Sequence, residues 1–226
     1  MRTVLLHGFT GGSHAFDHLG LDAVTPALPG HDGTPPATSW EDGLDQLEPM
    51  LEPGPVVLGG YSMGARIALG LALRRPELVS RLVLASGTAG IEDDAARARR
   101  RAEDEELARF VEEHGVPAFV EKWEQHPLLQ LPGDLIAQLR EHRLRHDAAG
   151  LASALRHLGP GAQPSYWGRL RELRLPVLLL AGDRDAKFTG LATRMHLSLP
   201  RSELRLLDCG HVVHLEQPEA FRGALR

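Results

Sequence analysis

Residues 56–64 read Val-Val-Leu-Gly-Gly-Tyr-Ser-Met-Gly, and this segment carries the strongest signal of the fold. It opens with a short apolar run, and short runs rich in valine and leucine are typical of buried parallel strands. A helical pattern follows from Met63 to Arg74 and stops before Pro76, which cannot continue a helix. The stretch therefore predicts a strand, a tight turn with Ser62 at its apex, and a helix.

A serine between two glycines at a strand-to-helix turn is the pattern of a nucleophile elbow. The turn is so tight that side chains at Gly60 and Gly64 would collide, and it holds the Ser62 hydroxyl above the edge of the sheet. A serine hydroxyl is nearly inert until a base takes its proton. The elbow therefore requires a histidine, and an acid to orient that histidine, further along the chain.

Candidates for both partners follow later strands, at the carboxyl ends where open α/β sheets bind their ligands. Asp183 and Asp185 come after the apolar run 177–181, and the usual spacing of three residues from the strand-ending glycine favours Asp185. His211 follows the last predicted strand, whereas the competing His214, one turn on, is more typical of a packed side chain. We predict a catalytic triad of Ser62, Asp185 and His211.

The segment His7-Gly8-Phe9 follows the first apolar run and is typical of a loop that supplies an oxyanion hole. Such a hole uses backbone amides aimed at the oxygen that becomes negative during the reaction. We expect the amides of Phe9 and Met63 to form it. The His7 side chain is expected to brace the loop.

The remaining apolar runs predict a mostly parallel sheet with helices on both faces, which is an α/β fold. Besides 56–58, the expected strands are 3–6, 23–28, 82–85, 177–181 and 204–207. Each run is short and closes on a glycine or a turn, as buried strands do.

Strand signals vanish from about residue 89 to residue 168, and helical periodicity replaces them. Apolar residues at helical spacing predict helices over 107–114 and 116–123, with Gly115 between them. Asp134 and Asp147 are candidate N-caps for two more helices. We therefore predict a core made of residues 1–88 and 169–226, with residues 89–168 inserted as a helical lid.

The composition of the 226-residue chain is that of an ordinary globular protein. A net charge of -5 disfavours a nucleic-acid partner. The single cysteine, Cys209, cannot form an internal disulfide or by itself a structural zinc site. No signal peptide or membrane-spanning stretch is evident, so we expect a cytoplasmic protein. We expect no cofactor and no metal, a small-molecule anionic substrate, and a monomer or small homo-oligomer.

With these motifs in place, the chain resembles the α/β-hydrolase superfamily over nearly all of its length. Within that superfamily it is similar to the 2-succinyl-6-hydroxy-2,4-cyclohexadiene-1-carboxylate synthases of menaquinone biosynthesis. The similarity rests on residues 60–66, on 86–91 with the arginine-rich segment that follows, on 123–127, and on 182–188. The last is the most telling, because Asp185-Ala-Lys-Phe188 matches the Asp-x-Lys-Phe of these synthases.

The resemblance implies an enzyme that eliminates pyruvate from a cyclohexene carrying three carboxylates, with the triad acting as a proton-abstracting base. It also implies that Arg66, Arg100 and Arg145 bind the substrate, with Trp123 and Tyr61 lining the pocket. Arginine suits this role because its planar fork grips a carboxylate at two points. The alternative for Arg100 is pairing with the acidic residues that follow it.

Two other functions use the same fold. A carboxylesterase or a carbon–carbon bond hydrolase has the same triad and oxyanion hole and acts through an acyl-serine. A non-catalytic receptor of this fold is also conceivable, although the complete set of serine, acid and histidine favours an enzyme.

Overall fold

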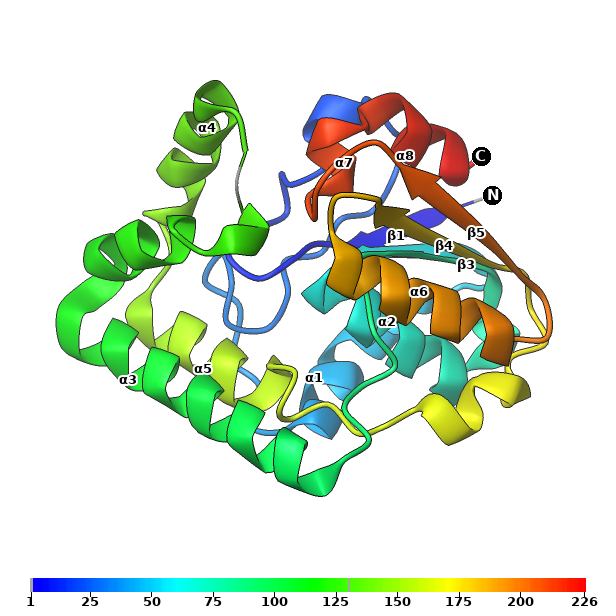
Figure 1. Ribbon diagram of the computed structural model, residues 1–226, viewed down its shortest axis with the longest axis horizontal. Helices are drawn as coiled ribbons and strands as arrows, with labels where there is room; N and C mark the ends of the chain where they lie inside the picture. The colour runs from blue at the N-terminus through cyan, green and yellow to red at the C-terminus, as the bar shows by residue number, and fades with distance from the viewer. Residues whose placement is uncertain (1, 130) are drawn as a thin grey trace.

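The computed structural model describes residues 2–129 and 131–226 and contains a five-stranded, entirely parallel sheet in the order β1-β2-β3-β4-β5 (Figure 1). The strands are β1 (Thr3–Leu6), β2 (Val56–Tyr61), β3 (Val79–Ala85), β4 (Val177–Gly182) and β5 (Ser202–Leu207). In β1, β2 and β4 every residue is buried, as expected for strands covered on both faces. The predicted α/β class and parallel pairing are confirmed.

Helices cover both faces of the sheet (Figure 1). They are α1 (Trp40–Leu47), α2 (Met63–Arg74), α6 (Ala186–Ser198), α7 (Val213–Glu216) and α8 (Pro218–Ala224), with the 3-10 turns η1 (Asp17–Leu19) and η5 (Trp167–Glu172). Helices α1, α2 and α6 share one apolar cluster with Leu58, Leu84 and Leu179, whereas α7 and α8 share another with Val57, Val83 and Leu178. Alternate strand residues thus face opposite layers.

Three helices lie between β3 and β4 in the chain and form a separate group at one side of the molecule (Figure 1). They are α3 (Asp94–Glu124), α4 (Gly133–Arg143) and α5 (Ala148–Leu158). Helices α3 and α5 pack together through their own apolar cluster, which includes Val111, Phe119 and Leu151. We call residues 94–158 the helical insertion.

Local signals placed most of these helices correctly. Gly115 interrupts α3 with φ 79° and ψ 168°, which matches the two helices expected on either side of it. Asp147 caps α5, its side chain accepting from the amides of Ala149 and Gly150. The cap expected at Asp134 is wrong, because α4 begins one residue earlier, at Gly133, after Pro132.

The strand expected over residues 23–28 does not form. Only Val24 makes a bridge, to Val4, through hydrogen bonds of 2.9 Å from Val24 N–H to Thr3 and from Leu5 N–H to Val24. Pro26 has no amide hydrogen, so the segment cannot continue the ladder. Among the described residues, no helix is both long enough and apolar enough to cross a bilayer.

Candidate active site

The turn between β2 and α2 holds Ser62 in a strained conformation, with φ 52° and ψ -108°. A Cβ atom added at Gly64 would collide with the backbone of Leu6 and His7, and one added at Gly60 would collide with Gly64 itself. Ser62 N–H donates to the carbonyl of Ala85 at 2.9 Å. The elbow is therefore fixed by close backbone packing on two sides, and its glycines are required sterically.

The structure brings Ser62, His211 and Asp185 together in hydrogen-bonded order. The distance from His211 Nε2 to Ser62 Oγ is 3.2 Å, and that from His211 Nδ1 to Asp185 Oδ2 is 2.7 Å. A carboxylate can only accept, so Nδ1 carries the proton and Nε2 is free to accept from the serine. Asp185 and His211 are 4% and 5% exposed, which shields the pair from water.

Neighbouring contacts fix the orientation of the acid and the base. The second carboxylate oxygen of Asp185 accepts from Phe188 N–H at 3.2 Å and so caps α6. The Phe188 ring lies edge-on to His211, with ring centroids 4.4 Å apart. The Asp-x-Lys-Phe segment therefore holds both the acid and the histidine through one helix start.

The two competing residues lie elsewhere. Asp183 is exposed. His214 is buried among Phe16, Tyr61 and Phe221, and burial lowers its pKa to about 3, with smaller contributions from His18 and His211. A histidine held neutral in an aromatic cluster packs the core rather than exchanging protons.

The loop after β1 places Phe9 beside the elbow. Leu28 N–H donates to His7 Nε2 at 3.0 Å, so His7 Nδ1–H donates to the Gly8 carbonyl at 2.8 Å, and burial lowers the pKa of His7 to about 4. His7 thus braces the loop as a neutral side chain. Within the described part of the chain, the amides of Phe9 and Met63 have no hydrogen-bond acceptor, as donors reserved for a ligand would.

Arg66 is buried to 5% exposure on α2, one turn after Ser62. Its Nη1 has no hydrogen-bond partner among the described residues, and its guanidinium lies 5.8 Å from the centre of the Trp40 ring. Burial, and to a smaller extent the nearby charge of Arg100, lowers its pKa to about 9, while Asp104 opposes both effects. A buried cation with an unused donor can bind an anion.

Arg100 lies close to Arg66 and is paired as the sequence alternative suggested. Its Nε donates to Asp104 at 2.8 Å, and Asp104 also accepts from Gly161 N–H at 3.0 Å. Arg66 and Arg100 carry two positive charges near the single negative charge of Asp104, so the three residues together retain an excess of positive charge. Arg100 is partly exposed, so pairing with Asp104 leaves donors available.

The structure does not bring Arg145 to this site. Its side chain is 63% exposed and pairs with Glu141 on the surface of the helical insertion. Arg143 instead points into the molecule, with a side chain 7% exposed and 3.3 Å from Glu124, and burial lowers its pKa. The helical spacing contained this signal, because Arg143 lies four residues after Leu139 and on the same face.

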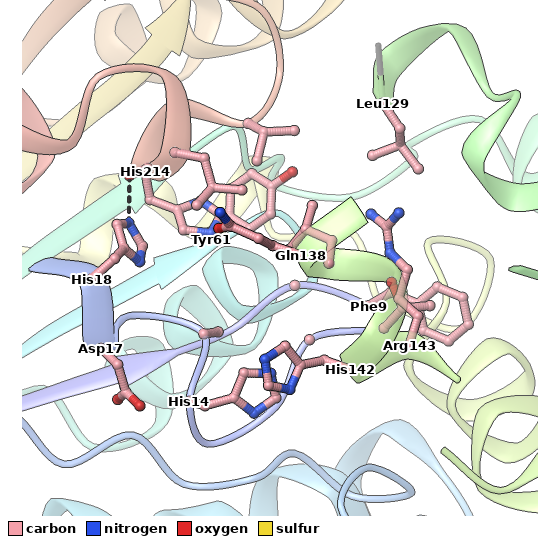
Figure 2. A pocket seen from close by; sticks show the side chains of 17 residues that line it. Phe9, His14, Asp17, His18, Tyr61, Leu129, Gln138, His142, Arg143 and His214 are labelled. Atoms are coloured by element: carbon pink, nitrogen blue, oxygen red, sulfur yellow. Dashed lines mark hydrogen bonds between the residues drawn. The ribbon is translucent and has the colours of Figure 1, made fainter. Parts of the chain in front are cut away.

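A cavity of about 290 Å³ lies between the loop after β1 and α4 (Figure 2). Tyr61 and Arg143 line it together with Phe9, Gln138 and the stacked rings of His14 and His142. Tyr61 is buried, which raises the pKa of its phenol and keeps it a neutral hydrogen-bond donor. A second cleft, about 880 Å³, lies between the loops that carry Asp185 and His211 and a set of apolar residues, namely Pro127, Leu128, Leu131, Pro132 and Leu135.

Trp123 forms part of the wall between the insertion and the core. Its ring meets Phe9 edge-on at 5.2 Å between centroids and stacks on Phe119 at 5.8 Å. Movement of α3 would therefore move the side chain of Phe9, and the backbone amide of Phe9 is expected in the oxyanion hole. Trp123 links the insertion to the site through aromatic packing.

Comparison with known proteins gives one consistent set of relatives. The sequence pattern of the alpha/beta hydrolase family matches residues 3–224. The Bacillus subtilis protein named "Putative 2-succinyl-6-hydroxy-2,4-cyclohexadiene-1-carboxylate synthase" is 37% identical, covering 96% of this chain and 86% of the relative. The 2-succinyl-6-hydroxy-2,4-cyclohexadiene-1-carboxylate synthase of Escherichia coli O1:K1 is 29% identical over 98% of this chain and 91% of its own.

Among solved structures, MenH from S. aureus superimposes with a TM-score of 0.91. It is 31% identical, and the match covers 98% of this chain and 91% of that one. The predicted α/β-hydrolase fold with inserted helices is therefore confirmed, as is the similarity to these synthases.

Proposed function

We propose that this chain, which belongs to the α/β hydrolase family, is a lyase of menaquinone biosynthesis. The substrate is 2-succinyl-5-enolpyruvyl-6-hydroxy-3-cyclohexene-1-carboxylate, and the products are pyruvate and 2-succinyl-6-hydroxy-2,4-cyclohexadiene-1-carboxylate. The names of relatives at 29–37% identity support this reaction. The observation that carries it is the buried Arg66 guanidinium with an unpaired Nη1 beside the elbow.

A buried charge without a full set of partners destabilises a protein, so its retention needs a compensating interaction. A carboxylate of the substrate would provide that interaction at Arg66, and Arg100 would share it. A neutral ester has no group that uses these charges. The site therefore favours an anionic substrate, and a substrate with three carboxylates fits a site with several arginines.

We propose that Arg143, instead of Arg145, supplies a further cation on the side of the 290 Å³ cavity. Tyr61 lies in the same cavity and can donate its phenolic proton to a carboxylate. Trp123 then acts through packing, by holding the insertion against Phe9.

In the proposed mechanism, His211 takes the proton of Ser62, and the serine oxygen removes a proton from the ring carbon. The electron pair of that C–H bond forms a C2=C3 double bond, the existing C3=C4 double bond shifts to C4=C5, and the C5–O bond to the enolpyruvyl group breaks. The departing enolate takes the proton held by His211, and the enol so formed tautomerises to pyruvate. Asp185 stabilises the imidazolium, as the acid of a triad does. The amides of Phe9 and Met63 stabilise the negative charge that spreads onto a carbonyl oxygen.

The second candidate function is hydrolysis of an ester or a carbon–carbon bond through an acyl-serine. The hydrogen bond between His211 and Ser62 also suits attack on a carbonyl, so the same residues would serve. The difference is a covalent intermediate, which the lyase does not need.

Pyruvate release, followed by coupling to lactate dehydrogenase, tests the proposal directly. The lyase should release pyruvate from the enolpyruvyl substrate, and deuterium at the abstracted ring position should slow a single turnover. Ser62→Ala is the control for contaminating activity. Failure to release pyruvate, together with a substrate-derived adduct on Ser62 formed at the rate of ester turnover, would establish the hydrolase instead.

A further inference from the structure

Ser86 is the first residue after β3 and lies beside the elbow. Tyr61 and Ala85 are register partners in β2 and β3, so Ser62 and Ser86 leave the sheet at the same level. Both have left-handed backbone conformations, with φ 52° at Ser62 and φ 51° at Ser86. A serine in this region is strained, and glycine would adopt the same turn freely.

The side chain of Ser86 contacts the backbone of the proposed base. Ser86 Oγ donates to the carbonyl oxygen of His211 at 2.8 Å, and Ser86 is only 2% exposed. Ser86 N–H donates to Leu180 in β4 at 2.9 Å, so the backbone from which the hydroxyl projects is itself fixed. Glycine would relieve the strain but lacks this hydroxyl.

The end of β3 contacts both reacting residues at once. Ala85 accepts from Ser62 N–H at 2.9 Å, and the next residue, Ser86, holds the His211 carbonyl. The loop of His211 is also held from its other side, because Gly210 N–H donates to Glu216 at 2.9 Å. Two consecutive residues of one rigid strand end therefore set the separation of nucleophile and base.

We propose that Ser86 is a positioning residue that keeps His211 Nε2 within reach of Ser62 Oγ. The two atoms are 3.2 Å apart, and a shift of about 1 Å can cost on the order of 100-fold in rate. In this strained conformation the hydroxyl of Ser86 reaches the His211 carbonyl while its amide stays bonded to Leu180. The inference rests on the proposed roles of Ser62 and His211 but not on the identity of the substrate.

The test compares Ser86→Ala, Ser86→Gly and the unmodified enzyme in their reaction with a fluorophosphonate. In that reaction the Ser62 oxygen bonds to phosphorus, fluoride leaves, and the serine proton passes to His211. We expect both variants to label Ser62 about 10-fold or more slowly, and kcat for pyruvate release to fall by a similar factor with KM changed less than about twofold. Thermal melting and circular dichroism check that each variant is folded.

Ser80→Ala is the matched control, because Ser80 lies at the opposite end of β3 and also donates its hydroxyl to a backbone carbonyl, that of Val56, at 2.9 Å. It should label at the normal rate. If Ser86→Gly labels Ser62 within twofold of the unmodified enzyme, the positioning role is wrong. Should Ser86→Ala fail to fold, Ser86→Gly still decides the matter, since glycine suits a positive φ. If the unmodified enzyme is labelled at Ser62 but releases no pyruvate, only the proposed lyase activity is rejected.

Discussion

Replacing Arg66 with methionine should make the protein more stable and less active. Burial lowers the pKa of Arg66 from its ordinary value to about 9, which corresponds to a cost on the order of 3 to 5 kcal/mol for keeping the charge in the folded state. Methionine has a similar shape and no charge. Loss of the contact with Trp40 offsets about 1 kcal/mol of the gain.

We therefore expect the free energy of unfolding to rise by about 2 kcal/mol, within the 1 to 4 kcal/mol seen when apolar residues replace buried charges. For a chain of this size that gain corresponds to about 4 to 8 °C in Tm. The sign follows from linkage. Below pH 9, Arg66 is charged in both the folded and the unfolded state, and the cost is constant. The cost disappears only as the pH rises above about 9 toward the ordinary pKa of arginine, because the folded protein loses the proton first.

Activity should change in the opposite direction. Loss of one partner of a buried charge pair costs about 2 to 4 kcal/mol, so kcat/KM for the anionic substrate should fall between about 30-fold and 1000-fold. Turnover of a neutral p-nitrophenyl ester should change little. Arg145→Met is the matched control, because its exposed pair with Glu141 should contribute less than about 1 kcal/mol to either property.

The assay measures thermal unfolding and both activities for the two variants side by side. Lower stability of Arg66→Met, or equal losses on the anionic and the neutral substrate, would contradict the assignment of Arg66 as a destabilising buried charge that binds the substrate. Either result would mean that Arg66 supports the fold and that its unpaired Nη1 is not reserved for a substrate.

Three further results are expected. Alanine at Ser62 or His211 should lower turnover by several orders of magnitude without unfolding the protein, and near-normal pyruvate release by Ser62→Ala would reject the triad. Asp185→Asn should be severe and Asp183→Asn mild in the same assay, whereas the reverse ranking would identify Asp183 as the acid. Because the pKa of His7 is lowered to about 4 by burial, unfolded chains bind this proton first, and stability should fall between pH 6.5 and 4. In urea unfolding, the free energy of unfolding of His7→Gln should decrease from pH 7 to pH 4.5 by about 2 kcal/mol less than that of the unmodified protein. An equal decrease in the two proteins would contradict this origin.

The parallel sheet and the neighbours of Ser62 were predictable because they follow from local patterns and one rule of topology. Short apolar runs identified all five strands close to their observed positions, and parallel strands place their carboxyl ends at one edge. Residues that follow β2, β4 and β5 therefore meet there, although Ser62 and His211 are far apart in the chain. The catalytic roles of these residues stay predictions until turnover is measured.

The failures arose where a local signal was weighed without its context. Residues 23–28 are apolar enough for a strand, but Pro26 removes an amide from the ladder and only Val24 pairs. Arg145 matches the family motif by its position, whereas Arg143 shares a helix face with Leu139 and is the residue that is buried. A family motif identifies a segment, and helical geometry decides which of its arginines faces inward.

Backbone strain was the feature that sequence patterns could reveal least, and it gathers around the candidate site. In the described part of the chain, the non-glycine residues with positive φ are Thr10, Asp32, Ser62 and Ser86. Thr10 lies in the loop of the expected oxyanion hole. Asp32 accepts a hydrogen bond of 2.7 Å from the N–H of Ser13, which is a residue of that loop. Aspartate tolerates this conformation, whereas at Thr10, Ser62 and Ser86 local preference favours glycine or asparagine. Strained residues persist only where the surroundings hold them, and here Ser62 presents its hydroxyl to His211 while Ser86 holds the His211 carbonyl. Relief of strain at Ser86 by glycine should therefore cost activity while preserving the fold.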